Sequence, residues 1–193
     1  MSSDPILDAV ETAVVAHFGH TPQRASVSFL GVDPIEILRF EPIPGERAYL
    51  SLGMSRHPMT SATESVQSTD GPRAELMLHL LDPTDEYADV WRKVALLAAS
   101  PAVEGVVYTD GMTVEVGEPL APGSACVGII VVESPLAPIA AGTDREVRVL
   151  QAIPATSTEL AWARVRGSAA LRERWAERGT DLLDLARRPV ALD

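Results

Sequence analysis

The four histidines of this chain are the first residues to consider as metal ligands or as acid–base catalysts. His17 and His20 stand three residues apart, but Gly19 ends the helical pattern between them and no carboxylate follows at metal-ligand spacing. A solvent-facing helix end accounts for both residues. We therefore predict no metal site here.

Glu75 and His79 form a second candidate pair. Residues 73–81 alternate apolar and polar side chains, which places Glu75 and His79 on one face of a strand. Four extended residues span about 13 Å, so Glu75 and His79 cannot share a proton or a metal ion without side chains from elsewhere in the chain. An enzyme or small-molecule site would need Asp70 and the preceding loop to fold over this face. That alternative stays open.

The sequence contains none of the familiar catalytic signatures, neither a nucleophile elbow, a phosphate-binding glycine loop, a dinucleotide fingerprint nor an HExxH helix. Cys126 is the only cysteine, so an intrachain disulfide is excluded. It lies in the apolar run 126–132, which favours a buried, inert thiol. We predict no enzyme activity and no cofactor.

The polar stretch 55–72 has neither helical nor strand periodicity. An irregular segment of this length is unusual in a compact domain, and such loops are often functional. His57, between Arg56 and Pro58, is the histidine best placed to meet a partner. An exposed loop histidine without a role is the alternative.

Charge and hydropathy restrict the partners. The formal net charge is −11, and the whole acidic excess lies before residue 121. Such a surface repels phosphate backbones and anionic lipid, so we expect neither nucleic acid nor membrane as partner, whereas a basic protein would be attracted. Without a basic N-terminal region or a long apolar stretch, the chain is expected to be cytosolic.

The periodicity of the remaining segments predicts an α+β fold of one domain over residues 1–193, with a mixed, mostly antiparallel sheet flanked by helices. We expect helices from Asp4-Pro5 to Gly19, from Asp82-Pro83 to Pro101, and from the capping box at 156–159 to Gly179 with a break at Gly167; a last turn is expected within 181–187. We expect extended segments at 25–30, 35–41, 48–54, 73–81, 126–132 and 146–153, with short extended pieces over 106–125.

Segments spread along the chain resemble the Suppressor of fused domain in their order and separation. They are Tyr49–Ser55, Thr69–Pro72, Glu75–Leu76, Leu150–Ile153, Thr158–Leu160 and Leu182–Leu185 with Arg187–Arg188 behind it. The resemblance implies a binding domain. The animal member grips a short peptide of Gli transcription factors against its sheet, a form of strand addition. Bacterial members resemble immunity proteins of polymorphic toxin systems, which neutralise a toxin by binding it.

The resemblance also implies a partner surface around the long loop. Asp70 occupies the place of the family aspartate that meets a histidine of the Gli peptide, although Asp-Gly-Pro is also ordinary turn chemistry. Pro58 and Val66 stand where the animal member has a tyrosine and a phenylalanine, so the Gli peptide itself is not the expected ligand. We predict that Asp70, His57, Pro58, Val66 and Glu75 bind the partner.

Three functions follow from these observations. The first is a protein-binding module of bacterial origin, an immunity-type protein that neutralises a partner toxin. The second is a small-molecule binder or enzyme that uses Glu75 and His79, and the third is an accessory domain without a fixed partner. Dimerisation through an exposed strand edge stays open.

Overall fold

A mixed sheet organises the chain, for which the computed structural model describes residues 4–63, 70–142 and 145–193. Its strands are β1 (Gln23–Val27), β2 (Ile35–Phe40), β3 (Glu46–Leu52), β4 (Arg73–Leu81), β5 (Thr113–Glu115), β6 (Cys126–Glu133), β7 (Ile139–Ala140) and β8 (Glu146–Thr156). The spatial order is β1-β2-β3-β4-β8-β6-β5, and β7 pairs with the start of β8. Within the described residues β4 and β8 run parallel and the other pairs are antiparallel. The predicted α+β class with a mostly antiparallel sheet is confirmed.

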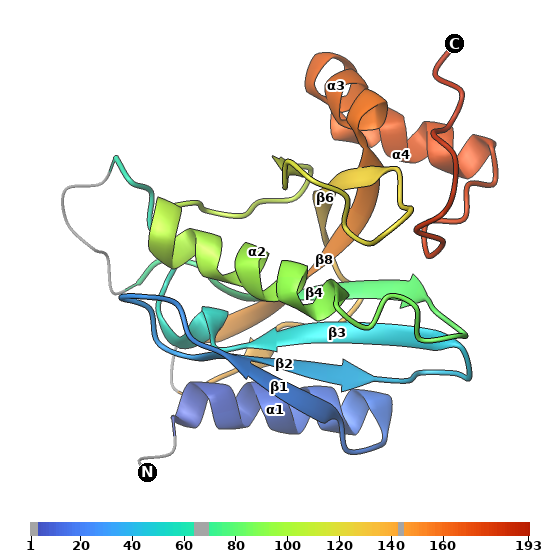
Figure 1. Ribbon diagram of the computed structural model, residues 1–193. Coiled ribbons are helices and arrows are strands. Elements are labelled where there is room, and N and C mark those ends of the chain that lie inside the picture. The colour runs from blue at the N-terminus through green and yellow to red at the C-terminus, as the bar shows by residue number, and fades with distance from the viewer. Residues whose placement is uncertain (1–3, 64–69, 143–144) are drawn as a thin grey trace.

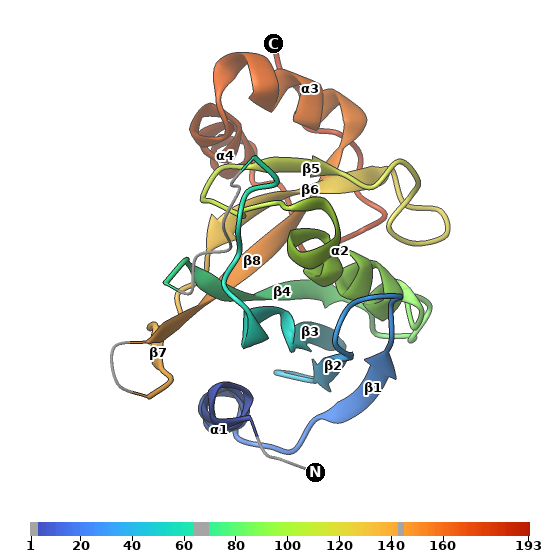
Figure 2. The same cartoon turned by 90° about the vertical axis from the view of Figure 1, so that its left-hand side faces the viewer.

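Helices cover both faces of this sheet (Figure 1). Helix α1 (Pro5–Phe18) lies on one face of β2, β3 and β4, and α2 (Val90–Glu104) lies on the other, as the turned view in Figure 2 makes plain. The alternation of β4 decides which side chains meet each helix: Leu76 packs in the α2 cluster and Met77 in the α1 cluster.

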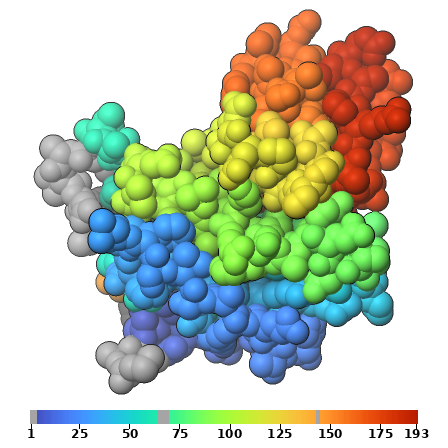
Figure 3. All heavy atoms as spheres, viewed as in Figure 1, coloured from blue at the N-terminus to red at the C-terminus, as the bar shows by residue number. Residues whose placement is uncertain are grey.

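Helices α3 (Ser157–Arg166) and α4 (Ser168–Glu177) pack on the far end of the twisted sheet. Their partners Ile153 and Ala155 on β8 continue the alternate row that begins with Val147 and Val149 beneath α1. These two helices and α1 therefore share one face of β8. In Figure 3 the C-terminal helices form a lobe that stands above α2 and the N-terminal strands.

Local sequence explains the bounds of α1. The side chain of Asp4 accepts a hydrogen bond from the backbone N–H of Ile6, Pro5 fills the first turn, and Gly19 ends the helix in the left-handed conformation. Val10 and Val14 follow Ile6 at four-residue spacing, and all three are buried. The predicted helix is confirmed at both ends.

Helix α2 begins later than its sequence suggests. Asp82 does not cap it but accepts hydrogen bonds from the backbone N–H groups of Glu86 and Tyr87, closing a separate turn. Asp85 in that turn has a φ of 59°, which a right-handed helix excludes. The helix therefore starts at Val90, and the prediction of a helix from Pro83 was wrong.

The same helix also continues through Pro101 to Glu104 instead of ending at the proline. A proline at 101 cannot donate to the carbonyl of Leu97. The hydroxyl of Tyr108 takes over, donating to that carbonyl at 2.8 Å. A side chain from beyond the helix thus satisfies the acceptor that Pro101 leaves open, and Gly105 ends the helix in the left-handed conformation.

β4 has its predicted bounds, the other predicted strands differ by one to three residues at one or both ends, and β8 is longer than predicted. It continues past Ile153 through Pro154 to Thr156, where the capping box of α3 begins. Pairing with β4 ends at Gln151, so the proline lies where β8 has β6 alone as its neighbour. Residues 178–193 form no helix, so the last turn predicted within 181–187 is absent from these residues. None of the helices in the described ranges is long and apolar enough to cross a membrane.

Candidate functional site

The two ends of the long loop are hydrogen-bonded to each other just before β4 begins. The backbone N–H of Met59 donates to the carbonyl of Pro72 at 2.8 Å. Gly71 lies so close to this contact that a Cβ there would stand 3.0 Å from the Met59 carbonyl oxygen and 3.1 Å from the Cβ of Pro58. The absence of a side chain at 71 therefore lets the two ends of the loop meet, which brings 57–58 near 70–73.

Arg73 fastens the same loop to the sheet. Its Nη1 donates to the backbone carbonyls of Ser55 at 2.8 Å and Arg56 at 2.6 Å. Both carbonyls belong to the 3₁₀ turn η1 (Met54–Arg56) that follows β3. One guanidinium thus joins the turn after β3 to the first residue of β4.

The buried carboxylate of Glu75 holds this turn in place through hydrogen bonds. Its carboxylate accepts hydrogen bonds from the hydroxyls of Ser51 and Ser55 and from the backbone N–H groups of Gly53, Met54 and Ser55. The side chain has no exposed surface. Burial raises the pKa of Glu75, although the hydrogen bonds from the Ser51 and Ser55 hydroxyls and from the Gly53 and Ser55 N–H groups oppose the shift. Glu75, predicted as a partner-binding residue, is therefore positioned to shape the loop rather than to touch a partner.

Two clefts flank the fastened loop. The β4–β8 cleft, of about 750 Å³, opens where the parallel pair begins and is lined by Met59, Asp70, Gly71, Pro72, Arg73, Ala74, Val107, Tyr108, Thr109, Asp110, Glu133, Arg145, Glu146, Arg148 and Leu150. The α2 cleft, of about 490 Å³, is lined by Gly31, Val32, Asp33, Ile35, Gly53, Met54, His57, Pro58, Thr60, Arg73, Ala98, Pro101, Ala102 and Arg145. Arg73 and Arg145 belong to both, so they lie at the boundary between the clefts.

The predicted partner residues divide between these clefts. Asp70 lines the β4–β8 cleft, whereas His57 and Pro58 line the α2 cleft. Val66 lies outside the described residues, and Glu75 lies behind the loop. Sequence reasoning missed Arg145, whose position just before β8 carries no motif.

The side chain of His57 is largely open, with 72% of it exposed. Its Nε2 lies 2.9 Å from the Oδ2 of Asp33 on the β1–β2 connection. The hydrogen bond from His57 lowers the pKa of the Asp33 carboxyl. The contact ties the rim of the α2 cleft to the loop between the first two strands.

The alternative active site does not assemble. Glu75 is enclosed by the turn at 53–55, whereas the Nε2 of His79 lies 2.7 Å from Glu46 on β3. The two groups lie in separate environments along the strand. Among the described residues, no group of three or more histidine, cysteine, aspartate or glutamate side chains is placed to hold a metal ion. Cys126 is buried, and burial raises the pKa of its thiol.

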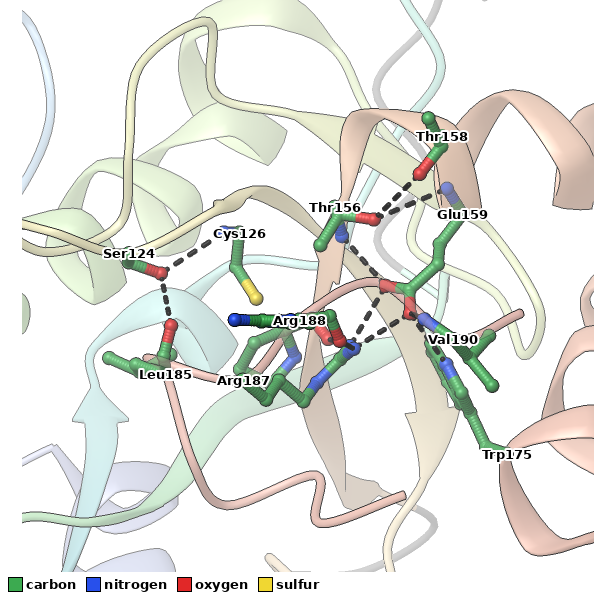
Figure 4. A network of polar contacts seen from close by, with 11 residues as sticks. Ser124, Cys126, Thr156, Thr158, Glu159, Trp175, Leu185, Arg187, Arg188 and Val190 are labelled. Atoms are coloured by element: carbon green, nitrogen blue, oxygen red, sulfur yellow. Dashed lines mark hydrogen bonds and ion pairs between the residues drawn. The ribbon is translucent and has the colours of Figure 1, made fainter. Parts of the chain in front are cut away.

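A second polar network holds the C-terminal segment against α3, away from both clefts (Figure 4). Thr156 and Glu159 form the predicted capping box, which is confirmed. The carboxylate of Glu159 also accepts hydrogen bonds from the indole N–H of Trp175 at 3.1 Å, from Arg187, and from the backbone N–H of Val190 at 3.0 Å. Burial opposes ionisation of Glu159, but hydrogen bonds from Arg187, Thr156 and Val190 outweigh it and hold the pKa of its carboxyl below the usual range.

Three solved structures share this fold across almost the whole chain. A homologue of Suppressor of fused from Neisseria gonorrhoeae FA 1090 is 18% identical, with a TM-score of 0.69 and coverage of 97% of this chain and 98% of that one. A chain in the crystal structure of the Sufu–Fu complex is 17% identical, with a TM-score of 0.70 and coverage of 98% and 93%. Drosophila Suppressor of Fused is 18% identical, with a TM-score of 0.69 and coverage of 97% and 51%. These likenesses establish the fold.

The sequence itself matches the family model described as Suppressor of fused protein (SUFU) over residues 31–188. No curated protein matches the chain. The matched range begins at the connection between β1 and β2 and ends next to Arg187 of the C-terminal network. It therefore includes the loop base, both arginines at the cleft boundary and the ion pair between Glu159 and Arg187. The chain belongs to the Suppressor of fused family.

Proposed function

We propose that this protein is a protein-binding domain that grips its partner at the two clefts around residues 57–73. One observation supports this proposal: three separate contacts hold the base of the loop in place between the two clefts. These contacts are the Met59–Pro72 hydrogen bond, the Arg73 bridge to η1 and the buried Glu75 carboxylate. A loop fixed at its base offers a shaped surface without a large ordering cost on binding.

Family membership supports the same conclusion. A chain of the Sufu–Fu complex, in which Sufu is bound to Fu, shares this fold over 98% of the present chain. Asp70, His57 and Pro58, which belong to the predicted surface, line the two clefts. The separation of Glu75 from His79 gives a catalytic alternative no common site.

We further propose that the partner is a toxin domain that this protein neutralises by covering it, as immunity proteins do. The acidic N-terminal portion would attract a basic partner, and nucleic-acid-cleaving toxins must themselves bind an anionic backbone. A partner seated in both clefts would be held by one face of the molecule.

The test is co-expression of the tagged protein with each protein encoded beside it, followed by affinity capture and a growth assay. The expected result is a stoichiometric complex and rescue of growth with one toxic neighbour. Asp70→Ala removes a carboxylate from the β4–β8 cleft and should weaken capture by about tenfold. Glu86→Ala is the matched control, because this exposed carboxylate lies just beyond the opposite end of β4.

The outcomes separate the remaining functions. Capture retained by Asp70→Ala but without growth rescue would support a binding domain whose partner is not a toxin. No complex with any neighbour and no rescue would contradict the toxin role and favour an accessory domain. Equal loss in Asp70→Ala and Glu86→Ala would show that the surface lies elsewhere.

A further inference from the structure

Two arginines, Arg73 and Arg145, lie at the boundary between the two clefts. Arg73 pairs with Val147 in the parallel register of β4 and β8, and Arg145 lies two positions before Val147. Because side chains alternate along a strand, this spacing places both arginines on the same side of the sheet. Both line the β4–β8 cleft and the α2 cleft.

Asp70 and three other carboxylates line the β4–β8 cleft, and those three are engaged by other arginines. Glu133 and Glu146 lie 2.6 Å and 3.4 Å from Arg148, and Asp110 lies 3.5 Å from Arg172. In the α2 cleft, Asp33 is bound to His57 and lies 3.9 Å from Arg56. Among the described residues, neither Arg73 nor Arg145 forms an ion pair of 4.0 Å or less.

The pair is electrostatically unfavourable as it stands. Arg73 donates hydrogen bonds to two neutral carbonyls, and the carboxylate of Asp4 favours its charge from a distance. Desolvation and the like charge of Arg145 both lower the pKa of Arg73. An anion bound between the two guanidinium groups would relieve this repulsion and accept hydrogen bonds from their free N–H groups.

Apolar walls continue on either side of the arginines. The α2 cleft is walled by Ala98, Pro101 and Ala102 of the helix, and the β4–β8 cleft by Met59, Val107 and Leu150. A chain that runs from one cleft into the other would therefore place apolar side chains on both sides of one central anionic group. By contrast, a partner whose C-terminal carboxylate sat between the arginines would have residues on one side of it only and would fill a single cleft.

We propose, resting on the protein-binding function above, that Arg73 and Arg145 receive the side-chain carboxylate of an aspartate or glutamate within an internal segment of the partner. The residues flanking that carboxylate are apolar and occupy the two clefts. The recognised segment is thus acidic even though this protein is acidic overall, because Glu133, Glu146 and Asp110 of the β4–β8 cleft already pair with other arginines.

The test is a titration of the ¹⁵N-labelled protein with three blocked pentapeptide probes, read from the arginine Nε–Hε signals. The probes are acetyl-Ala-Leu-Glu-Leu-Ala-amide, its Gln analogue, and the Gln analogue with a free C-terminal carboxylate. At probe concentrations up to about 10 mM, we expect saturable shifts of the Arg73 and Arg145 signals with the Glu peptide. Binding of either Gln peptide should be about tenfold weaker.

Arg145→Gln should remove the preference for the Glu peptide. Arg166→Gln, an exposed arginine at the end of α3, is the matched control and should keep it. Circular dichroism confirms that each variant is folded, and Arg73→Lys provides a second variant that keeps the charge but loses the planar fork. Equal binding of the Glu and Gln peptides, no saturable shift with any probe, or preference for the free C-terminus would each overturn the proposal.

The partner itself gives an independent outcome. A captured partner that Arg145→Gln still binds with full affinity would overturn this inference and leave the binding function intact. Failure to capture any partner would count against the binding function, whereas the peptide titration would still decide whether the arginines recognise a side-chain carboxylate.

Discussion

Glu159 and Arg187 form a two-pronged ion pair inside the protein, with Nη1 2.7 Å from Oε1 and Nη2 2.9 Å from Oε2. The pair joins the first turn of α3 to a residue 28 positions later in the chain. Nη2 of Arg187 also donates to the carbonyl of Pro154, and its guanidinium lies 5.5 Å from the centre of the Trp175 ring. The irregular C-terminal segment is thereby fixed against the end of β8.

Removing one member of this pair should be costly. Arg187→Met leaves the Glu159 carboxylate buried without its cation, and we expect the free energy of unfolding to fall by about 3–5 kcal/mol. The double variant Arg187→Met with Glu159→Gln should recover part of that loss. Urea denaturation of the single and double variants measures both, and a double variant no more stable than Arg187→Met would contradict the explanation.

The same pair predicts a pH dependence. Because the pKa of Glu159 is lower in the folded protein than its value of 4.5 when unpaired, its stabilisation is present above that value and is lost as the pH falls through the folded pKa. The difference in unfolding free energy between the wild type and Arg187→Met should therefore narrow below pH 4.5. Denaturation curves at a series of acidic pH values test this, and a widening difference would refute it.

Glu75 should behave with the opposite sign. Its folded pKa lies above the ordinary value, so the wild type loses stability as the pH rises through the folded pKa. Glu75→Gln removes this titration and also sets an amide NH₂ against backbone donors, at a cost of about 1–3 kcal/mol. Its stability deficit relative to the wild type should shrink as the pH rises from 4.5 through that pKa. Thermal unfolding across this range measures the deficit, and a constant or growing deficit contradicts the prediction.

Tyr108 and Pro101 should be coupled energetically. Tyr108→Phe removes the donor to the Leu97 carbonyl and should cost about 1–2 kcal/mol. Pro101→Ala supplies a backbone N–H for the same carbonyl, so the loss on removing the hydroxyl should be smaller in that background. A double-mutant cycle by chemical denaturation measures the coupling. Independent, additive effects would show that the hydroxyl does not replace the helix hydrogen bond.

The Tyr108 hydroxyl should also titrate late, because burial raises its pKa to about 12. Absorbance at the tyrosinate band should show this group ionising after the more exposed tyrosine Tyr87. The Tyr108→Phe variant identifies its contribution. Loss of a component near pH 10 in that variant would contradict the burial of the hydroxyl.

Gly128 should tolerate no side chain. A Cβ there would lie 2.2 Å from the carbonyl oxygen of Val114 and 2.8 Å from the Cδ1 of Leu160, so β5, β6 and α3 would have to separate. We expect Gly128→Ala to cost about 3 kcal/mol or more. Gly117→Ala, with open space but a φ of +83°, is the control and should cost about 1 kcal/mol. Equal losses would show that β5 yields to the new methyl group.

Local patterns predicted the elements whose determinants lie within a few residues. The alternation of 73–81 corresponds to β4 at both ends, and the capping residues at Asp4 and Thr156 fixed the starts of α1 and α3. The prediction that α2 ends at Pro101 was wrong, because Tyr108, outside the helix, replaces the hydrogen bond that the proline cannot make. No pattern within the helix carries that information.

The candidate site was predictable only in part for the same reason. Alternation placed Glu75 on the correct face of β4 but could not show that the turn at 53–55 covers it. Arg145 becomes visible only when β8 pairs with β4, since 72 positions separate Arg145 from Arg73 in the sequence. The family resemblance directed attention to Asp70 and His57, and the clefts add the residues that surround them.

The position of β8 has a consequence for synthesis on the ribosome. It is the last strand along the chain, yet it lies between β4 and β6 in the middle of the sheet. Until Glu146–Thr156 has emerged, nascent β4 has an open edge and the two halves of the sheet cannot join. The N-terminal strands therefore keep an unpaired edge at β4 until this late segment has been synthesised, and during that interval the edge is open to chaperones and to aggregation.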